Sequence, residues 1–316
     1  MSRTRSVAVS TLVTLAALLP VARAQLSEPA AFASQLQNQY RMVSNITYLT
    51  ANNWEAKLDL YLPREVSQPN PTLIYIHGGG WTGGAKESSV LTFLSFLEKG
   101  WSVVNVEYRL ARVSLAPAAV EDCLCALRWI IHNAKTYNFD TNNLVVTGNS
   151  AGGHLALTTG MLPTTAGLDR QCPGPEELKV SAIVNWYGIT DVEDLLDGAN
   201  MKTYAVTWLS SMENRREIAR RVSPIHYVRA GLPPIITIHG DADPTVPYTH
   251  AVRLHEALEK AGVANKLVTI SGGKHGGFNR EQTLRAYNEI ENFLASRNLM
   301  KRSPTTASQV RESREK

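Results

Sequence analysis

The chain has 316 residues, of which 44% are hydrophobic and 19% are charged. It is therefore long enough to bury a sizeable core, and its composition excludes a disordered or a fibrous protein. The formal net charge of +4 falls to +1 without the three arginines among the first 24 residues (4 − 3 = 1), and no basic stripe indicates a nucleic-acid partner.

The first 24 residues have the pattern of a secretory signal peptide. Arg3 and Arg5 precede an apolar stretch over residues 7–19, and Ala22-Arg23-Ala24 matches an Ala-x-Ala cleavage site. A membrane anchor is the alternative, but the stretch is too short to span a bilayer comfortably and is followed by Pro20. We therefore expect cleavage after Ala24 and a mature protein that is secreted or periplasmic and does not bind a membrane.

The residues after Gln25 predict a hairpin and then alternating strands and helices. A short polar segment leads into two alternating strands, 43–49 and 56–62, around the turn Asn52-Asn53. Further strands are expected at 72–76, 102–106, 143–147, 180–186, 235–239 and 266–270, and helices at 88–99, 117–134, 151–157, 247–261 and 280–296. This alternation indicates an α/β fold whose sheet is mostly parallel and eight-stranded, with an antiparallel edge hairpin and helices on both faces.

Two segments interrupt the alternation, and a tail follows it. Residues 163–178 are rich in Pro, Gly and Thr, which indicates an excursion over the surface. Residues 189–229 lack a strand, and we expect them to form a small cap over the carboxyl ends of the strands. We expect the arginines of this cap to form a solvated helical face rather than an anion site. They are Arg215, Arg216, Arg220 and Arg221. The domain thus spans residues 25–300, and the polar residues 301–316 are expected to be disordered.

Three cysteines allow at most one internal disulfide. Cys123 and Cys125 lie two residues apart on a predicted helix, so their side chains point to different faces and are not expected to pair with each other. A bridge between Cys172 and one of them is one possibility in an oxidising compartment, and three buried free thiols are the other.

The pentapeptide Gly148-Asn149-Ser150-Ala151-Gly152 lies between a β-branched run and a small-residue helix. Strand, sharp turn and helix in this order are what a nucleophile elbow requires, and the flanking glycines let strand and helix approach closely. A serine hydroxyl is a poor nucleophile at neutral pH, so it needs a base and a third group that orients the base. In a parallel sheet these groups come from loops at the carboxyl ends of the strands.

Two later loops offer an orienting carboxylate and a base. The strand 235–239 is followed by Asp241 and Asp243, and we choose Asp243 as the orienting carboxylate and expect Asp241 to form a hydrogen bond within the loop. The strand 266–270 is followed by a loop in which four glycines surround His275, so the loop can bend sharply and present the imidazole as the base. The other candidates lie on a predicted helix (His250, His255), in the cap (His226) or one helical turn after the serine (His154).

A glycine run follows the strand 72–76. His77-Gly78-Gly79-Gly80-Trp81 can turn its N–H groups toward a carbonyl oxygen that gains negative charge, and Ala151 offers another amide at a helix N-terminus. A phosphate-binding loop is the alternative, but no Lys-Ser/Thr pair follows at the required spacing.

Several motifs in a fixed order then resemble a known family. They are His77–Trp81, Glu107–Leu110, Gly148–Gly152, Asp243 with Val246-Pro247, and His275, and they resemble the α/β-hydrolase esterases of the hormone-sensitive-lipase type. The continuation Ser150–Ala156 is more similar to the bacterial acetyl-esterase and feruloyl-esterase-like branch. The resemblance covers roughly residues 43–298. One departure is that only residues 25–42 separate the signal from the first strand, too few for the long amino-terminal helical cap of typical relatives.

The resemblance implies the roles of individual residues. Ser150, Asp243 and His275 would form a catalytic triad, Gly79, Gly80 and Ala151 would supply the oxyanion hole, and His77 would brace the glycine loop. The expected protein is a secreted serine carboxylesterase that hydrolyses short-chain or aryl carboxylic esters through an acyl-enzyme, without a metal or cofactor. Trp186, Tyr187 and Trp208 could seat an aromatic acyl or alcohol group, although such residues more often fill a core.

Other functions remain open at this stage. An arylformamidase or a peptidase-type acyl hydrolase would use the same groups on a different bond. A non-catalytic binding module on the same fold would have lost a member of the triad, and none is missing. The expected partner is a small-molecule ester, and an exposed edge strand permits a homodimer without requiring one.

Overall fold

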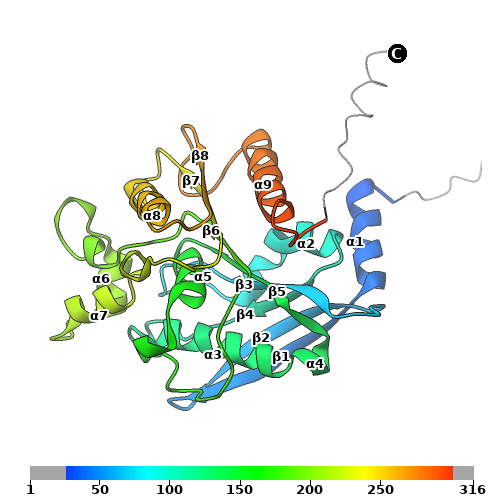
Figure 1. Ribbon diagram of the computed structural model, residues 1–316, viewed down its shortest axis with the longest axis horizontal. Helices are drawn as coiled ribbons and strands as arrows, with labels where there is room; N and C mark the ends of the chain where they lie inside the picture. The colour runs from blue at the N-terminus through cyan, green and yellow to red at the C-terminus, as the bar shows by residue number, and fades with distance from the viewer. Residues whose placement is uncertain (1–25, 302–316) are drawn as a thin grey trace, which may run out of the picture.

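The computed structural model describes residues 26–301, so the expected signal peptide and the tail from residue 302 lie outside the described residues. Its centre is an eight-stranded sheet with the order β1-β2-β4-β3-β5-β6-β7-β8 (Figure 1). β2 is antiparallel to β1 and to β4, and all other neighbours are parallel. The strands are β1 (Tyr40–Ala51), β2 (Trp54–Pro63), β3 (Asn70–Ile76), β4 (Ser102–Val106), β5 (Phe139–Asn149), β6 (Ala182–Trp186), β7 (Ile235–Gly240) and β8 (Asn265–Ile270). The prediction of a mostly parallel sheet with an antiparallel edge hairpin is confirmed.

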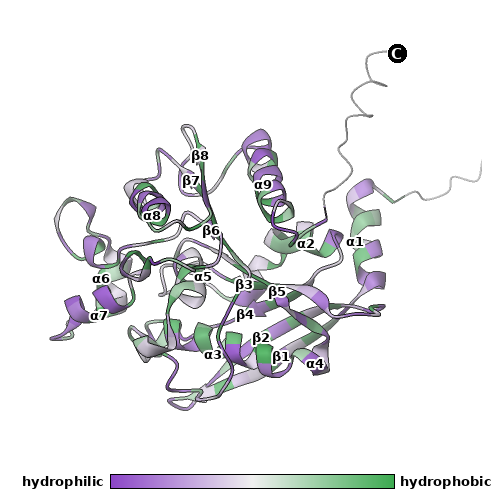
Figure 2. Cartoon of the chain, in the orientation of Figure 1, coloured by the Kyte–Doolittle hydropathy of each residue, from purple (hydrophilic) through white to green (hydrophobic). Residues whose placement is uncertain are grey.

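Helices cover both faces of the sheet and divide the core in two. Buried residues of α3, α5 and α8 pack with one face of the strands, and buried residues of α1, α2 and α9 pack with the other. Figure 2 shows hydrophilic and hydrophobic residues alternating along α8 and α9, as expected for helices with one side on the sheet and the other in solvent. The helices are α1 (Glu28–Gln39), α2 (Leu94–Glu98), α3 (Ala118–His132), α4 (Ala134–Tyr137), α5 (Ala151–Met161), α8 (Thr249–Lys260) and α9 (Arg280–Ala295).

The central strands read as continuous apolar runs because both of their faces are covered. Every residue of β4 and β7 is buried, and so is the run Leu144–Gly148 of β5. Burial on both sides fixes the positions of the strand ends, and the loops that follow β3, β5, β7 and β8 therefore start from a rigid edge.

Two local expectations differ from the structure. The segment after Gln25 is the helix α1, because one leucine in this polar stretch, Leu36, is buried in the core cluster that α2 and α9 share. The expected helix 88–99 is a 3₁₀ helix, η1 (Lys86–Phe93), followed by the single turn α2. Lys86 and Ser89 are both buried, and a 3₁₀ helix brings residues three apart onto one side, which an α-helix does less closely.

Residues 189–229 contain short helices and no strand. They are η3 (Glu193–Leu195), η4 (Gly198–Asn200), α6 (Thr203–Leu209), α7 (Arg215–Arg221) and η5 (Pro224–Tyr227). In Figure 1, α6 and α7 lie together at one end of the molecule, on the far side of the sheet from α1. Arg216 of α7 is exposed and pairs with Asp197, and Arg221 donates a hydrogen bond to the Ala166 carbonyl, so these side chains are occupied within the protein.

The excursion over residues 163–178 is fixed to α3 by a disulfide. Cys172 is bonded to Cys125, with 5.6 Å between the Cα atoms, whereas Cys123 is a buried free thiol. This outcome selects one of the possibilities that the spacing of the cysteines left open. Within residues 26–301, no helix has the length and apolarity needed to cross a bilayer.

Candidate active site

Ser150 occupies a sharp turn between β5 and α5. Its φ of 57° and ψ of −120° lie in a region that non-glycine residues rarely adopt, and such strain is often found at functional sites. The turn is possible because both neighbouring glycines lack a side chain. A Cβ on Gly148 would lie 2.5 Å from the Ile76 carbonyl oxygen, and one on Gly152 would lie 2.1 Å from the same atom.

The hydroxyl of Ser150 is the first member of a chain of hydrogen bonds. Its Oγ lies 2.9 Å from Nε2 of His275, and Nδ1 of His275 lies 2.7 Å from Oδ2 of Asp243. A carboxylate can only accept, so the proton of the neutral imidazole is assigned to Nδ1 and leaves Nε2 free to accept from Ser150. The structure thus brings together three residues that lie 93 and 32 positions apart in the chain (243 − 150 = 93 and 275 − 243 = 32).

The side chain of Asp243 is fully buried and its oxygens are satisfied on both sides. Oδ1 accepts from the amides of Thr245 (2.7 Å) and Val246 (3.0 Å), while Oδ2 accepts from His275 and His239. Burial alone would raise the pKa of Asp243, but the hydrogen bonds from His239, His275 and Val246 outweigh it and hold this pKa well below its usual range. Asp243 is therefore ionised at neutral pH and stabilises the tautomer of His275 described above.

His239 is a contact of Asp243 that the sequence did not single out. It is the fifth residue of β7, is fully buried, and directs Nε2 toward Asp243 Oδ2 (3.1 Å) and the Val246 carbonyl oxygen (3.1 Å). Both partners are acceptors, so Nε2 carries the proton. The available signal was a histidine at a strand end four residues before the chosen carboxylate, which is too common a pattern to stand alone.

Asp241, the competing carboxylate, faces away from this chain of bonds. Its Oδ1 accepts from the amide of Gly272 at 2.7 Å and so joins the loop after β7 to the loop after β8. The competing histidines other than His226 also form side-chain hydrogen bonds elsewhere. His250, for example, contacts Asp194 and Thr190, and burial lowers its pKa to about 4.

The glycine loop after β3 supplies unpaired backbone donors. Gly79 and Gly80 have φ of 121° and 58°, values that glycine adopts without strain. Within residues 26–301, the amides of Gly79, Gly80 and Ala151 donate no hydrogen bond. Ala151 is the first residue of α5, so its amide also carries the positive end of the helix dipole. These three amides can therefore donate hydrogen bonds to a negatively charged oxygen.

Trp81 fastens the end of this loop to α5 and to residues 189–229. Its indole N–H donates to Nδ1 of His154 (3.2 Å), and Nε2 of His154 donates to the Val222 carbonyl (2.6 Å). The ring of Trp81 also stacks on Trp208 of α6 at 4.1 Å. Burial lowers the pKa of His154 to about 4, so this histidine stays neutral at pH 7 and can accept the indole proton. We call Trp81, His154, Trp208 and Val222 the tryptophan clamp.

His77 holds the start of the same loop. Its Nδ1 lies 2.7 Å from the Gly78 carbonyl oxygen, and its ring stacks on Tyr108 at 4.3 Å. The hydroxyl of Tyr108 donates to the His77 carbonyl oxygen at 3.1 Å. The contacts are those of a side chain that braces the backbone of the glycine loop.

The three aromatic residues that could line a substrate site or fill the core have different positions. Trp208 is fully buried in the tryptophan clamp. Trp186 is the last residue of β6, and Tyr187 follows it. Both line a cavity whose other walls include α9 but none of residues 189–229. The ring of Tyr187 packs edge-on against His275, with 4.7 Å between the centroids. Among residues 26–301, no group of His, Cys, Asp and Glu side chains has the arrangement of a metal site.

The sheet order, the turn at Ser150 and the loops around it define an α/β-hydrolase fold. The chain belongs to the BD-FAE family, whose match covers residues 58–258.

Relatives and solved structures agree with this assignment. The chain is 30% identical to the esterase LipQ of Mycobacterium tuberculosis over 68% of its own length and 52% of that protein, and 26% identical to an ethyl acetate hydrolase of Pseudomonas putida over 80% and 81%. It spans about half the length of the first curated relatives that it matches. The structure of esterase Est2 from Thermogutta terrifontis is similar, with a TM-score of 0.68 and 27% identity over 84% of this chain and 95% of that one.

Proposed function

We propose that this protein is a serine carboxylesterase that hydrolyses short-chain or aryl carboxylic esters through an acyl-enzyme. The observation that carries the proposal is the unbroken series of hydrogen bonds from Ser150 through His275 to Asp243, beside three unpaired amides. Relatives named esterase and ethyl acetate hydrolase support the choice of an ester bond.

In the first half of the proposed reaction, the ester carbonyl carbon is attacked by Ser150 Oγ. Nε2 of His275 takes the hydroxyl proton as the bond forms, and Asp243 stabilises the resulting imidazolium. The carbonyl oxygen becomes an oxyanion, which the amides of Gly79, Gly80 and Ala151 would bind. When the intermediate collapses, His275 returns the proton to the leaving alkoxide, and the acyl group stays on Ser150.

In the second half, water replaces the alcohol. His275 removes a proton from the water as it attacks the acyl carbon, the same amides bind the oxyanion, and the proton returns to Ser150 Oγ as the carboxylic acid leaves. Every proton moves between the Ser150 hydroxyl, the His275 imidazole, the substrate and water.

The turnover of p-nitrophenyl acetate and butyrate tests the proposal. Ser150→Ala should lower kcat by about 10⁶-fold, the loss typical of a removed serine nucleophile. Ser271→Ala is the matched control, because Ser271 is exposed in the histidine loop, and it should retain full activity. Labelling by a fluorophosphonate should add one adduct per chain to the wild type, at Ser150, and none to Ser150→Ala. Hydrolysis by Ser150→Ala at the wild-type rate would refute the assignment.

We also propose that the protein is exported. The support is the amino-terminal pattern of two arginines, an apolar stretch and Ala22-Arg23-Ala24. Amino-terminal sequencing of the protein from the medium or periplasm of an expressing bacterium should begin at Gln25, and a cytoplasmic product that still begins at residue 1 would contradict export.

A further inference from the structure

The helix α6 places one tyrosine between two loops of the proposed active site. Tyr204 is the second residue of this helix and is partly buried. On one side it packs on the glycine loop, because a Cβ on Gly80 would lie 2.9 Å from its Cβ and 3.2 Å from its Cγ. On the other side its hydroxyl donates to the Thr245 carbonyl oxygen at 3.0 Å, in the loop after β7. Neither contact has a part in the reaction as described above.

Both contacts are one step away from a group that the reaction uses. The amide of Gly80 is one of the three oxyanion donors. The amide of Thr245 donates to Oδ1 of Asp243 at 2.7 Å, so Tyr204 binds the carbonyl of the same residue whose N–H holds the orienting carboxylate. One side chain therefore joins the loop of the oxyanion donors to the loop of the carboxylate.

The order of the strands shows what lies between these two loops. β3 precedes the glycine loop and β7 precedes the Asp243 loop, and they are separated in the sheet by β5 and β6. Strands three places apart lie about 14 Å from one another, which is more than one side chain can span, so the loops must lean together over the ends of the strands between them. Ser150 directly follows β5. Tyr204 thus connects the two loops across the turn that carries the nucleophile.

The surroundings of Tyr204 favour a single arrangement of its side chain. Burial, with a smaller contribution from the negative charge of Asp243, raises the pKa of Tyr204 well above its usual range, so the hydroxyl keeps its proton and donates. The ring also lies 5.8 Å from that of Trp81 in the tryptophan clamp. Lys202, directly before α6, adds a bond from Nζ to the Pro244 carbonyl oxygen at 2.9 Å. The start of α6 is therefore fixed to the Asp243 loop at two carbonyls.

We propose that Tyr204 is a positioning residue of the esterase, which sets the distance between the Gly80 amide and the Asp243 loop across the nucleophile. The proposal rests on the esterase function proposed above. Amides stabilise an oxyanion best when they are in place before the charge appears, so a displaced donor slows the chemical step rather than weakening the binding of the ester. Tyr204 acts through the backbone of Gly80 and Thr245 and not on the ester itself.

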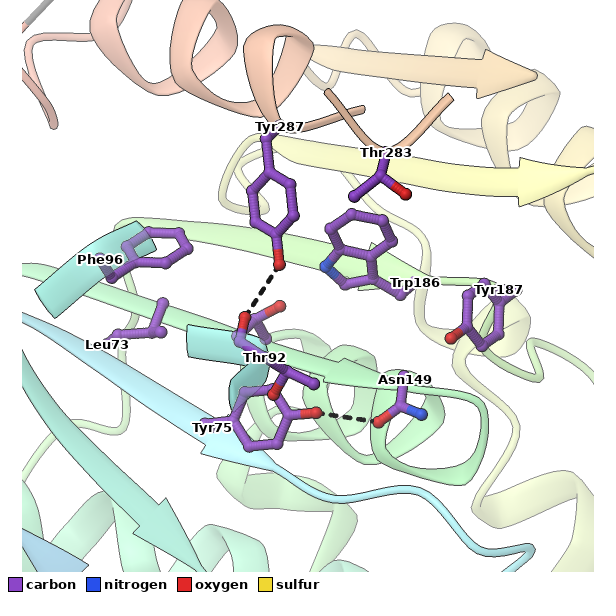
Figure 3. A pocket seen from close by; sticks show the side chains of 10 residues that line it. Leu73, Tyr75, Thr92, Phe96, Asn149, Trp186, Tyr187, Thr283 and Tyr287 are labelled. Atoms are coloured by element: carbon purple, nitrogen blue, oxygen red, sulfur yellow. Dashed lines mark hydrogen bonds between the residues drawn. The ribbon is translucent and has the colours of Figure 1, made fainter. Parts of the chain in front are cut away.

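Two substitutions separate the two contacts, and a third is the matched control. Tyr204→Phe keeps the ring on Gly80 but removes the bond to Thr245, and Tyr204→Leu removes the ring as well. Tyr287→Phe is the control, because the hydroxyl of Tyr287 also donates to a backbone carbonyl, that of Thr92 at 2.9 Å (Figure 3). This tyrosine lines a cavity to which neither the glycine loop nor the loop after β7 contributes a residue.

Turnover of p-nitrophenyl acetate is measured as kcat per site labelled by the fluorophosphonate. We expect kcat to fall about fivefold in Tyr204→Phe, which loses one hydrogen bond, and roughly thirtyfold in Tyr204→Leu, which also frees an oxyanion donor. KM should change by less than about twofold in both, because the contacts act on the chemical step. Tyr287→Phe should leave kcat within about twofold of the wild type.

Inhibition by trifluoroacetone shows whether the loss comes from the oxyanion donors and the triad. This ketone adds to a serine nucleophile and forms a tetrahedral oxyanion that the same amides would bind, beside a protonated His275. Its inhibition constant should rise in the two Tyr204 variants by the factors by which kcat falls, and should stay unchanged in Tyr287→Phe.

Two results would overturn the proposal. One is a loss of kcat in Tyr204→Leu that is no greater than in Tyr287→Phe, and the other is a loss of kcat without a rise in the inhibition constant. If Tyr204→Leu does not fold, Tyr204→Phe keeps the ring and carries the test by itself. The esterase proposal is judged separately, because it fails only if Ser150→Ala still hydrolyses p-nitrophenyl acetate.

Discussion

Two loops meet at Ser150, and they are held in different ways. In the glycine loop after β3, a Cβ at Gly79 would lie 2.1 Å from the Gly83 carbonyl oxygen, so the backbone is packed against itself. The histidine loop after β8 is packed only in part. A Cβ at Gly273 or Gly276 would lie 2.8 Å from Ile270 or Tyr187, but one at Gly272 or Gly277 would meet no atom within 4 Å, and the His275 side chain is 21% exposed. The amides that would stabilise charge are therefore fixed by packing before a substrate arrives. The base lies in a less fully packed loop, where its bonds to Ser150 and Asp243 and the ring of Tyr187 locate it.

This contrast has a physical reason in the proposed reaction. Preorganised donors stabilise an oxyanion because no reorganisation is needed when the charge appears. The base must accept a proton from one oxygen and deliver it to another, so a small freedom of its ring is compatible with its role. The contrast predicts that the orientation of His275 depends on one carboxylate. The positions of the glycine-loop amides should depend instead on the packing of their backbone.

Asp243→Asn should have the largest effect. An amide nitrogen facing Nδ1 of His275 forces the proton to Nε2, and the imidazole can no longer accept from Ser150. We expect kcat to fall by about 10⁴-fold, the loss known for this change in serine hydrolases, with little change in KM. Asp241→Asn is the control, because Asp241 lies in the same loop but accepts a hydrogen bond from the Gly272 amide and not from His275. The kcat of this variant should change by less than about threefold. A loss below tenfold in Asp243→Asn would mean that His275 is held by other contacts.

Gly79→Ala and Gly277→Ala test the contrast between the loops directly. Both residues have a positive φ, so alanine is strained at each, but only Gly79 lacks space for a methyl group. Moving the Gly79 amide removes an oxyanion donor, so we expect kcat to fall by about 10²-fold or more. Gly277→Ala should cost only about 1 kcal/mol of folding free energy and leave kcat within about threefold. Steady-state kinetics with chemical unfolding checks both, and equal kcat losses would remove the distinction between the loops.

The tryptophan clamp should make stability depend on pH. The pKa of His154 is about 4 in the folded protein and about 6.5 in the unfolded chain, so the unfolded chain binds more protons between these values. Stability should be fully present above pH 6.5 and fall as the pH drops toward 4, by about 2 kcal/mol at pH 5 for this one group. The low pKa of Asp243 also makes stability fall as the pH drops, but in a lower range, because its contribution is lost only below about pH 4.

Urea unfolding at pH 7 and pH 5 separates the clamp from the rest of the protein. His154→Asn should be less stable than the wild type at pH 7. Its free energy of unfolding should change less between pH 7 and pH 5 than that of the wild type, by about 2 kcal/mol. His226→Asn is the control, because it removes an exposed imidazole. Its free energy of unfolding should change between pH 7 and pH 5 by as much as that of the wild type. An unchanged difference in His154→Asn would show that this histidine is not buried in its neutral form.

The fold and the central residues of the site could be predicted because their signals are local. A strand followed by glycine, serine and glycine specifies the turn at Ser150, and a glycine-rich loop after a late strand specifies the place of His275. The choice of Asp243 over Asp241 depended on a family resemblance, because two carboxylates two residues apart in one loop cannot be distinguished by spacing. The structure distinguishes them by their hydrogen-bond donors, because Asp243 accepts from His275 and Asp241 accepts from the Gly272 amide.

What the sequence could not predict depends on contacts between distant segments. The tryptophan clamp joins Trp81 to His154 and Val222, positions that have no shared pattern in the chain. The sequence left open whether Trp208 lines a substrate site or fills the core, and the packing of α6 against the glycine loop buries it fully. The helix α1 was missed for the same reason, because a single buried leucine gives too weak a periodic signal.

The smallest predicted effect concerns His239, which shares Oδ2 of Asp243 with His275. His239→Leu removes one hydrogen bond to a charged group, about 1.5 kcal/mol, and should lower kcat about tenfold because the carboxylate is then less firmly oriented toward His275. His239→Gln can still donate from an amide and should recover most of the loss. To exclude a purely structural effect, kcat is expressed per site labelled by the fluorophosphonate, so that unfolded protein does not count. If kcat per labelled site is unchanged in His239→Leu, the position of Asp243 is set by the Thr245 and Val246 amides alone, and the histidine loop is then held by backbone packing as firmly as the glycine loop.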